Sequence, residues 1–152
     1  MLNTTHKVDK SYLAKDLHDL NVTHGHIINS CRAVIESVGS TETRALVKDI
    51  AVTHREHQHE LEEKINELAG GPLKLNPVVE AVRKVDIPLT IVRTDQALLD
   101  ELLTKEQMLV LEYERGLNSF NDVNGLERLM QSHFDELNAV CDALQEAISH
   151  YE

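Results

Sequence analysis

Residues 45–72 read ALVKDIAVTHREHQHELEEKINELAGGP, and their apolar side chains recur at alternating three- and four-residue steps. That period is typical of an amphipathic α-helix. The apolar stripe of this segment consists of Leu46, Val47, Ile50, Leu61, Ile65 and Leu68. His54 and His57 lie in line with the stripe, and the Gly-Gly-Pro that follows ends the helix. The pattern therefore predicts a helix over residues 42–69 that turns two imidazoles toward the protein interior.

Three further segments show the same period and predict helices over residues 11–38, 95–120 and 124–150. Most connections between these helices are short and so join antiparallel neighbours, whereas residues 70–93 are long enough to run back along a bundle. That connection contains Asn76-Pro77, a typical helix start, and we expect a short helix over residues 77–85. The sequence therefore predicts an all-α fold, a single four-helix-bundle domain over residues 1–152 with one crossover connection.

The composition restricts the partners of the protein. The chain has 152 residues, a formal net charge of −11 and two cysteines, Cys31 and Cys141. Because binding to nucleic acid requires a basic surface that neutralises phosphates, this charge argues against a nucleic-acid partner. No stretch approaches the roughly 20 apolar residues that span a bilayer, and no N-terminal apolar run resembles a signal peptide. We therefore expect a cytoplasmic protein that does not bind membranes and whose cysteines are buried thiols.

Ionisable residues interrupt the apolar stripe of every long predicted helix. These residues are His24, His54, His57, Glu106 and His133. Each lies near the middle of its helix, so we expect all five to meet in one layer of the bundle. A buried carboxylate with four imidazoles is costly to desolvate unless a partner satisfies it. A divalent metal ion would do so, because imidazole and carboxylate are its natural ligands. The alternative is a hydrogen-bonded network that only fixes the register of the helices.

The same layer resembles the metal-binding pattern of the ferritin-like superfamily. Those bundles bind two metal ions through Glu on the first helix, Glu-x-x-His on the second, Glu on the third and Glu-x-x-His on the fourth. The corresponding residues here are His24, His54-x-x-His57, Glu106 and Met130-x-x-His133. Glu106 and Tyr113 match the superfamily's Glu-x6-Tyr spacing, so Tyr113 is expected to hydrogen-bond Glu106 or to fill the core. Helix ends like INELAGG, residues 65–71, occur in a bacterial ferritin-like family of mostly unassigned function. The resemblance covers residues 11–150 and implies a ferritin-like bundle with a metal site.

Three carboxylates of the superfamily's pattern are missing from this chain. Their positions are occupied by His24, His54 and Met130. Because two of the missing groups bridge the ions of di-iron relatives, the resemblance implies one divalent transition ion, Zn²⁺ or Fe²⁺ above all. Two ions stay an alternative, one held by the three histidines of the first two helices and the other by Glu106 and His133. Glu136, one turn after His133, is a further candidate ligand.

The predicted site favours a metal-binding protein that serves in metal handling or stress response and has no established catalytic activity. Two other functions stay open: an iron-dependent oxidoreductase that handles peroxide or O₂, and a metal-free bundle with a structural or interaction role. A homodimer of bundles also agrees with the sequence, although the sequence identifies no interface. The remaining histidines lie off the apolar stripes and are expected to be exposed to solvent: His6, His18, His26, His59 and His150.

Overall fold

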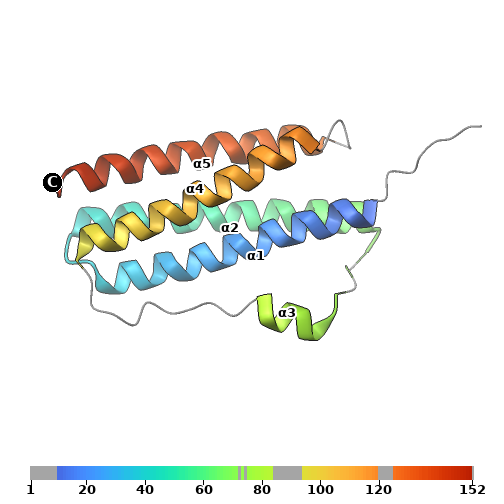
Figure 1. The fold of residues 1–152 in the computed structure, drawn as a ribbon, viewed down its shortest axis with the longest axis horizontal. Helices are drawn as coiled ribbons and strands as arrows, with labels where there is room; N and C mark the ends of the chain where they lie inside the picture. The colour runs from blue at the N-terminus through green and yellow to red at the C-terminus, as the bar shows by residue number, and fades with distance from the viewer. Residues whose placement is uncertain (1–9, 72, 74, 84–93, 120–124, 152) are drawn as a thin grey trace, which may run out of the picture.

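Five helices make up the described part of the computed structural model, which comprises residues 10–71, 73, 75–83, 94–119 and 125–151. The helices are α1 (Lys10–Ser37), α2 (Thr41–Ala69), α3 (Pro77–Arg83), α4 (Asp95–Ser119) and α5 (Leu126–Ser149). Figure 1 shows the four long helices side by side along the long axis of the molecule, with short α3 beside α1. No strand occurs among the described residues. The prediction of an all-α four-helix bundle with a short helix in its long connection is confirmed.

Capping residues explain the two ends of α2. The Ser40 hydroxyl accepts a hydrogen bond from the Thr43 backbone N–H across 3.2 Å, so the helix begins one residue earlier than predicted. At the other end Gly70 adopts the left-handed conformation, with φ 69°, and donates its N–H to the Asn66 carbonyl oxygen. A side chain would be strained in that conformation, which is why a glycine follows the last helical residue. The two caps therefore fix the length of the helix that carries two candidate site residues.

The start of α5 differs from the prediction, whereas the start of α3 agrees with it. α5 begins at Leu126 rather than at residue 124, because Gly125 (φ 75°) adopts the left-handed conformation immediately before it. Residue 124 lies outside the described part of the chain. α3 begins at Pro77 as predicted, and the Asn76 side-chain oxygen accepts a hydrogen bond from the Val78 N–H at 2.9 Å. The helix is described as far as Arg83, and residues 84 and 85 of the prediction lie outside the described residues.

The long helices pack around one apolar core. α1 packs along α2 and α4 packs against α5; α1 also contacts α4, whereas α2 and α5 pack less closely against each other. The largest fully buried aliphatic side chains are Leu17, Ile27, Leu61, Leu99, Leu102, Leu109, Leu126, Leu137 and Leu144. Burial of each such side chain stabilises the fold by about 1.5–3 kcal/mol. The bundle therefore has enough apolar contact to accommodate a polar layer in its middle.

A histidine–glutamate side-chain contact that the sequence did not predict joins short α3 to α1. His18 Nε2 lies 2.6 Å from Glu80 Oε2, and the two side chains are only 15% and 12% exposed. The expectation that His18 is solvent exposed is therefore wrong, because α3 covers it. The expectation is also wrong for His26, which is only partly exposed and has its ring Nε2 buried.

Other predictions about core and surface residues agree with the structure. His59 and His150 are exposed, and Cys31 and Cys141 are buried. His6 lies outside the described residues. Among the described helices, none combines the length and the apolar character that crossing a bilayer requires.

Candidate metal centre

The five candidate residues all lie in the core of the bundle. α1 contributes His24, α2 contributes His54 and His57, α4 contributes Glu106 and α5 contributes His133. Each of these side chains has no exposed surface. They occupy positions of the apolar stripes, so the same pattern that buries the leucines of each helix turns its polar residue inward. That these residues bind a metal ion stays a prediction.

A chain of hydrogen bonds joins the polar layer across the bundle. Glu106 Oε1 lies 2.5 Å from His54 Nε2, and His54 Nδ1 lies 2.7 Å from His24 Nδ1. The Tyr113 hydroxyl lies 2.7 Å from His24 Nε2 and 2.9 Å from His133 Nδ1. All four long helices are therefore linked through buried polar side chains.

With every imidazole neutral, the direction of these hydrogen bonds is fixed. The Glu106 carboxylate can only accept, so His54 carries its proton on Nε2 and accepts at Nδ1. His24 then donates from Nδ1 and accepts the Tyr113 hydroxyl proton at Nε2. The Tyr113 oxygen in turn accepts from Nδ1 of His133. Consequently, Nε2 of His133 has no proton and offers a free lone pair.

His57 offers a free lone pair for a similar reason. Its Nε2 lies 2.8 Å from Glu136 Oε2, a carboxylate oxygen that accepts the imidazole proton. Its Nδ1 is then unprotonated. Neither Nδ1 of His57 nor Nε2 of His133 has a hydrogen-bond partner among the described residues. The two rings are stacked, with centroids 3.9 Å apart and 20° between their planes. Two buried lone pairs therefore belong to rings that touch each other.

Burial favours the neutral form of three of these imidazoles, His24, His57 and His133. Together with charge repulsion from His57 and His54, burial lowers the pKa of His133 to about 3. Burial also lowers the pKa of His24 far below its ordinary value, and repulsion between the imidazoles adds to this effect. The pKa of His57 is lowered by burial as well, although the hydrogen bond and charge of Glu136 oppose the change. Since only a neutral imidazole can bind a metal ion, these groups need not lose a proton first at neutral pH.

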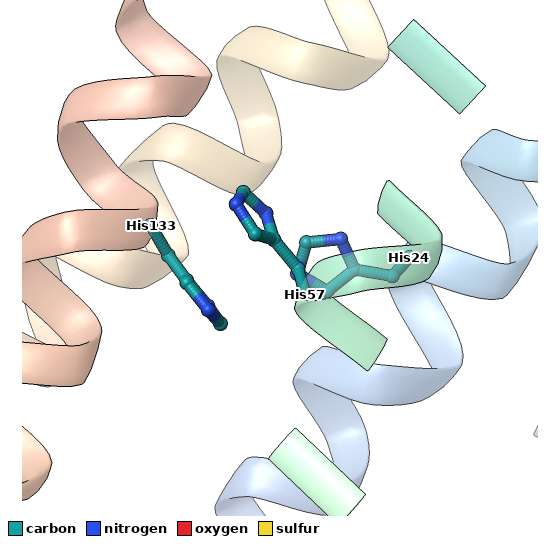
Figure 2. A group of neighbouring side chains, drawn as sticks. All are labelled: His24, His57 and His133. Atoms are coloured by element: carbon teal, nitrogen blue, oxygen red, sulfur yellow. The ribbon is translucent and has the colours of Figure 1, made fainter. Parts of the chain in front are cut away.

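Three imidazoles from three helices form the group best suited to one ion. His24, His57 and His133 each offer a ring nitrogen, and these atoms lie within 4.8 Å of one another (Figure 2). A tetrahedral zinc site with bonds of about 2.1 Å has nitrogens about 3.4 Å apart, so a small contraction of the group would suffice. His24 can join only by giving up one of its two hydrogen bonds. His57 and His133 each have one ring nitrogen without a hydrogen-bond partner among the described residues.

His54 and Glu106 lie next to this group rather than within it. Both nitrogens of His54 are engaged, one with Glu106 and the other with His24. The second carboxylate oxygen of Glu106, Oε2, is buried and has no hydrogen-bond partner among the described residues. The structure therefore divides the five predicted ligands into three imidazoles that lie together and a His54–Glu106 pair that orients His24.

Two further residues take part in the layer. Tyr113 bonds His24 and His133, not Glu106, because seven residues along a helix separate it from Glu106 by about 10.5 Å. Glu60, which the sequence analysis missed, has its Oε1 3.4 Å from Nε2 of His133. The sequence spacing could have indicated Glu60, since Glu60 follows His57 by three residues just as Glu136 follows His133.

The comparisons with known proteins bear on the fold. No family model matches the sequence, and no curated protein is significantly similar to it. A C-terminal deletion mutant of Dps from Mycobacterium smegmatis is 17% identical, with a TM-score of 0.75 over 89% of this chain and 96% of that chain. A point mutant of Dps1 from the same organism is also 17% identical, with a TM-score of 0.77 over 93% and 98% of the two chains. The protein therefore has the ferritin-like bundle fold that the sequence resemblance implied.

Proposed function

We propose that this protein binds a divalent transition-metal ion at the buried imidazoles of its bundle and serves in metal handling or stress response. One observation carries the proposal: Nδ1 of His57 and Nε2 of His133 are buried acceptors without a hydrogen-bond partner among the described residues. A buried polar group without a partner costs about 1–3 kcal/mol. A bound cation would satisfy both nitrogens.

The chemistry of the donor set supports a borderline ion, Zn²⁺ or Fe²⁺. His24, His57 and His133 would supply three imidazole nitrogens, and Glu106, which is linked to His24 through His54, has a buried carboxylate oxygen without a hydrogen-bond partner among the described residues. Imidazole suits Zn, Fe, Ni and Cu, whereas Mg and Ca prefer oxygen ligands. Bound Zn²⁺ would join three helices, and bound iron would supply a redox centre. The three imidazoles suit one ion, and two ions are the alternative. The number of metal equivalents per chain would decide between them.

Two other functions have observations in their favour. Tyr113 lies between two imidazoles, and burial raises its pKa, so a neutral phenol would stand beside a bound ion. This arrangement favours an iron-dependent oxidoreductase that handles peroxide, and a lack of peroxide consumption by iron-loaded protein would exclude it. The chain of hydrogen bonds from Glu106 to His133 is complete without an ion, which favours a structural bundle. Full stability after chelation is the signature of that function.

The test of metal binding is elemental analysis of protein purified without an affinity tag. We would compare the wild type with His57→Ala/His133→Ala and with the control His59→Ala/His150→Ala, whose histidines are exposed. Circular dichroism would establish that each variant is folded. The proposal predicts one equivalent of a transition metal in the wild type and the control, and its loss in the first variant. Equal metal content in all three proteins, or none even after reloading, would refute it.

A further inference from the structure

α2 and α5 carry the same short motif, His-x-x-Glu. It comprises His57 with Glu60 on α2, and His133 with Glu136 on α5. Residues three apart lie on one face of a helix, in successive turns. The imidazoles have no exposed surface, whereas the carboxylate side chains of Glu60 and Glu136 are 48% and 52% exposed. Each helix therefore presents a buried nitrogen ligand and, next to it, an oxygen ligand that reaches solvent.

The two motifs pair crosswise between the helices. Glu136 Oε2 lies 2.8 Å from Nε2 of His57, and Glu60 Oε1 lies 3.4 Å from Nε2 of His133. The second contact is not a hydrogen bond, and Nε2 of His133 has no hydrogen-bond partner in the described part of the chain. In the neutral network this nitrogen carries a lone pair, so two acceptors lie against each other. A cation between them would turn this repulsion into attraction.

The negative charge of the carboxylates where α2 and α5 meet, here called the α2–α5 seam, is a second reason to expect a cation there. Glu60 lies close to Glu136 and to the exposed Glu56 and Glu63. Carboxylates gathered in this way raise the local concentration of cations and the rate at which they arrive.

The seam is also open to solvent beside Glu60. A surface hollow of about 410 Å³ between α2 and α5 is lined by residues of both helices and includes Glu60. The basic residues in it are Lys64, which is paired with Glu67 at 3.2 Å, and Arg128. α2 and α5 also pack less closely against each other than α1 packs against α2, or α4 against α5. A hydrated ion can therefore reach Glu60 without the helices moving apart.

We propose that Glu60 and Glu136 form an entry site that captures a divalent cation at the α2–α5 seam and passes it to His133 and His57. The inference rests on the proposed function, since the ion's destination is the imidazole group. Exposed carboxylates bind a hydrated ion weakly, and the borderline ions then exchange oxygen ligands for imidazole nitrogen. Because Nε2 of His133 faces Glu60 and is unprotonated, the transfer needs no proton to leave.

The test is the rate of Co²⁺ uptake, followed by stopped-flow visible absorption at low ionic strength. The variant is Glu60→Gln/Glu136→Gln. The matched control is Glu42→Gln/Glu146→Gln, which removes the same charge from the same two helices, at exposed residues that line a different surface hollow. We expect uptake by the variant to be about tenfold slower and to lose most of its dependence on salt, because the two carboxylates that attract the cation have been neutralised. The control should stay within about twofold of the wild type.

The outcomes separate the entry site from the metal site itself. Wild-type protein that takes up Co²⁺ while the variant does so equally fast would refute the entry site and leave the proposed function standing. A variant that never reaches the wild-type cobalt content would show that the carboxylates are permanent ligands, which also refutes the proposal. Wild-type protein that binds no Co²⁺ would overturn the proposed function, and the entry site with it.

Discussion

Replacement of Tyr113 by phenylalanine tests whether one hydroxyl holds the polar layer together. The hydroxyl lies 2.7 Å from Nε2 of His24 and 2.9 Å from Nδ1 of His133, and all three side chains are fully buried. Phenylalanine keeps the ring and leaves almost no cavity, so the change isolates the two hydrogen bonds. Each buried partner left unsatisfied costs about 1–3 kcal/mol, and partial rearrangement reduces the sum. We therefore expect Tyr113→Phe to lower the free energy of unfolding of the metal-free protein by about 2–4 kcal/mol.

The assay is urea denaturation at pH 7, followed by circular dichroism, in the presence of a chelator. Tyr12→Phe is the matched control, because Tyr12 is 65% exposed and its substitution should change the stability by less than about 0.5 kcal/mol. Melting experiments should agree, since 1 kcal/mol shifts the Tm of a protein of this size by about 2–4 °C. If Tyr113→Phe unfolds within about 0.5 kcal/mol of the wild type, the hydroxyl does not hold the network and the assignment of its proton is wrong.

Three other predictions concern acid stability, a helix cap and the cysteines. The pKa of His133 is about 3 in the folded protein and about 6.5 in the unfolded chain, so the unfolded chain binds more protons between these values. Stability should therefore be lost as the pH falls through this window, by about 2 kcal/mol from His133 alone between pH 7 and pH 5. Urea midpoints that do not depend on pH would contradict this prediction. Ser40→Ala removes the cap of α2 and should cost about 1 kcal/mol in the same assay, whereas an unchanged midpoint would show that the cap contributes nothing. Burial raises the pKa of Cys31 to about 12 and that of Cys141 to about 11. Ellman's reagent should therefore modify neither thiol in the native protein at pH 8, and both thiols after unfolding. Rapid reaction of the native protein would show that the bundle opens near these cysteines.

The sequence predicted the fold well because burial and helix geometry act on the same positions. Leu61 and His54 are buried because their positions in the helical repeat place them on the apolar face of α2. The helix ends were less predictable, since they depend on local backbone conformation. Gly125 is one example: its left-handed conformation moves the start of α5 away from residue 124, and no periodicity reports that. Burial of all five candidate residues followed from the stripes alone.

The contacts within the candidate site could not be predicted in the same way. Which nitrogen meets which oxygen depends on side-chain rotamers and on the rotation of each helix, and periodicity leaves both undetermined. His18 shows the difficulty, because its partner Glu80 comes from α3, whose position against α1 is set by the crossover connection. The Glu60–His133 contact depends likewise on how α2 and α5 approach each other. Spacing places residues in a layer, and the packing of the helices then decides their partners.

Anomalous diffraction from crystals of metal-loaded protein tests the central claim most directly. With data collected at the zinc absorption edge, a strong peak about 2.0–2.1 Å from Nδ1 of His57 and Nε2 of His133 would show the ion on the two free lone pairs. A third ligand from His24 or Glu106 is expected at the same peak. Peaks confined to exposed carboxylates, with the imidazole layer unchanged and free of anomalous signal, would contradict the claim and favour a bundle whose polar layer serves structure alone.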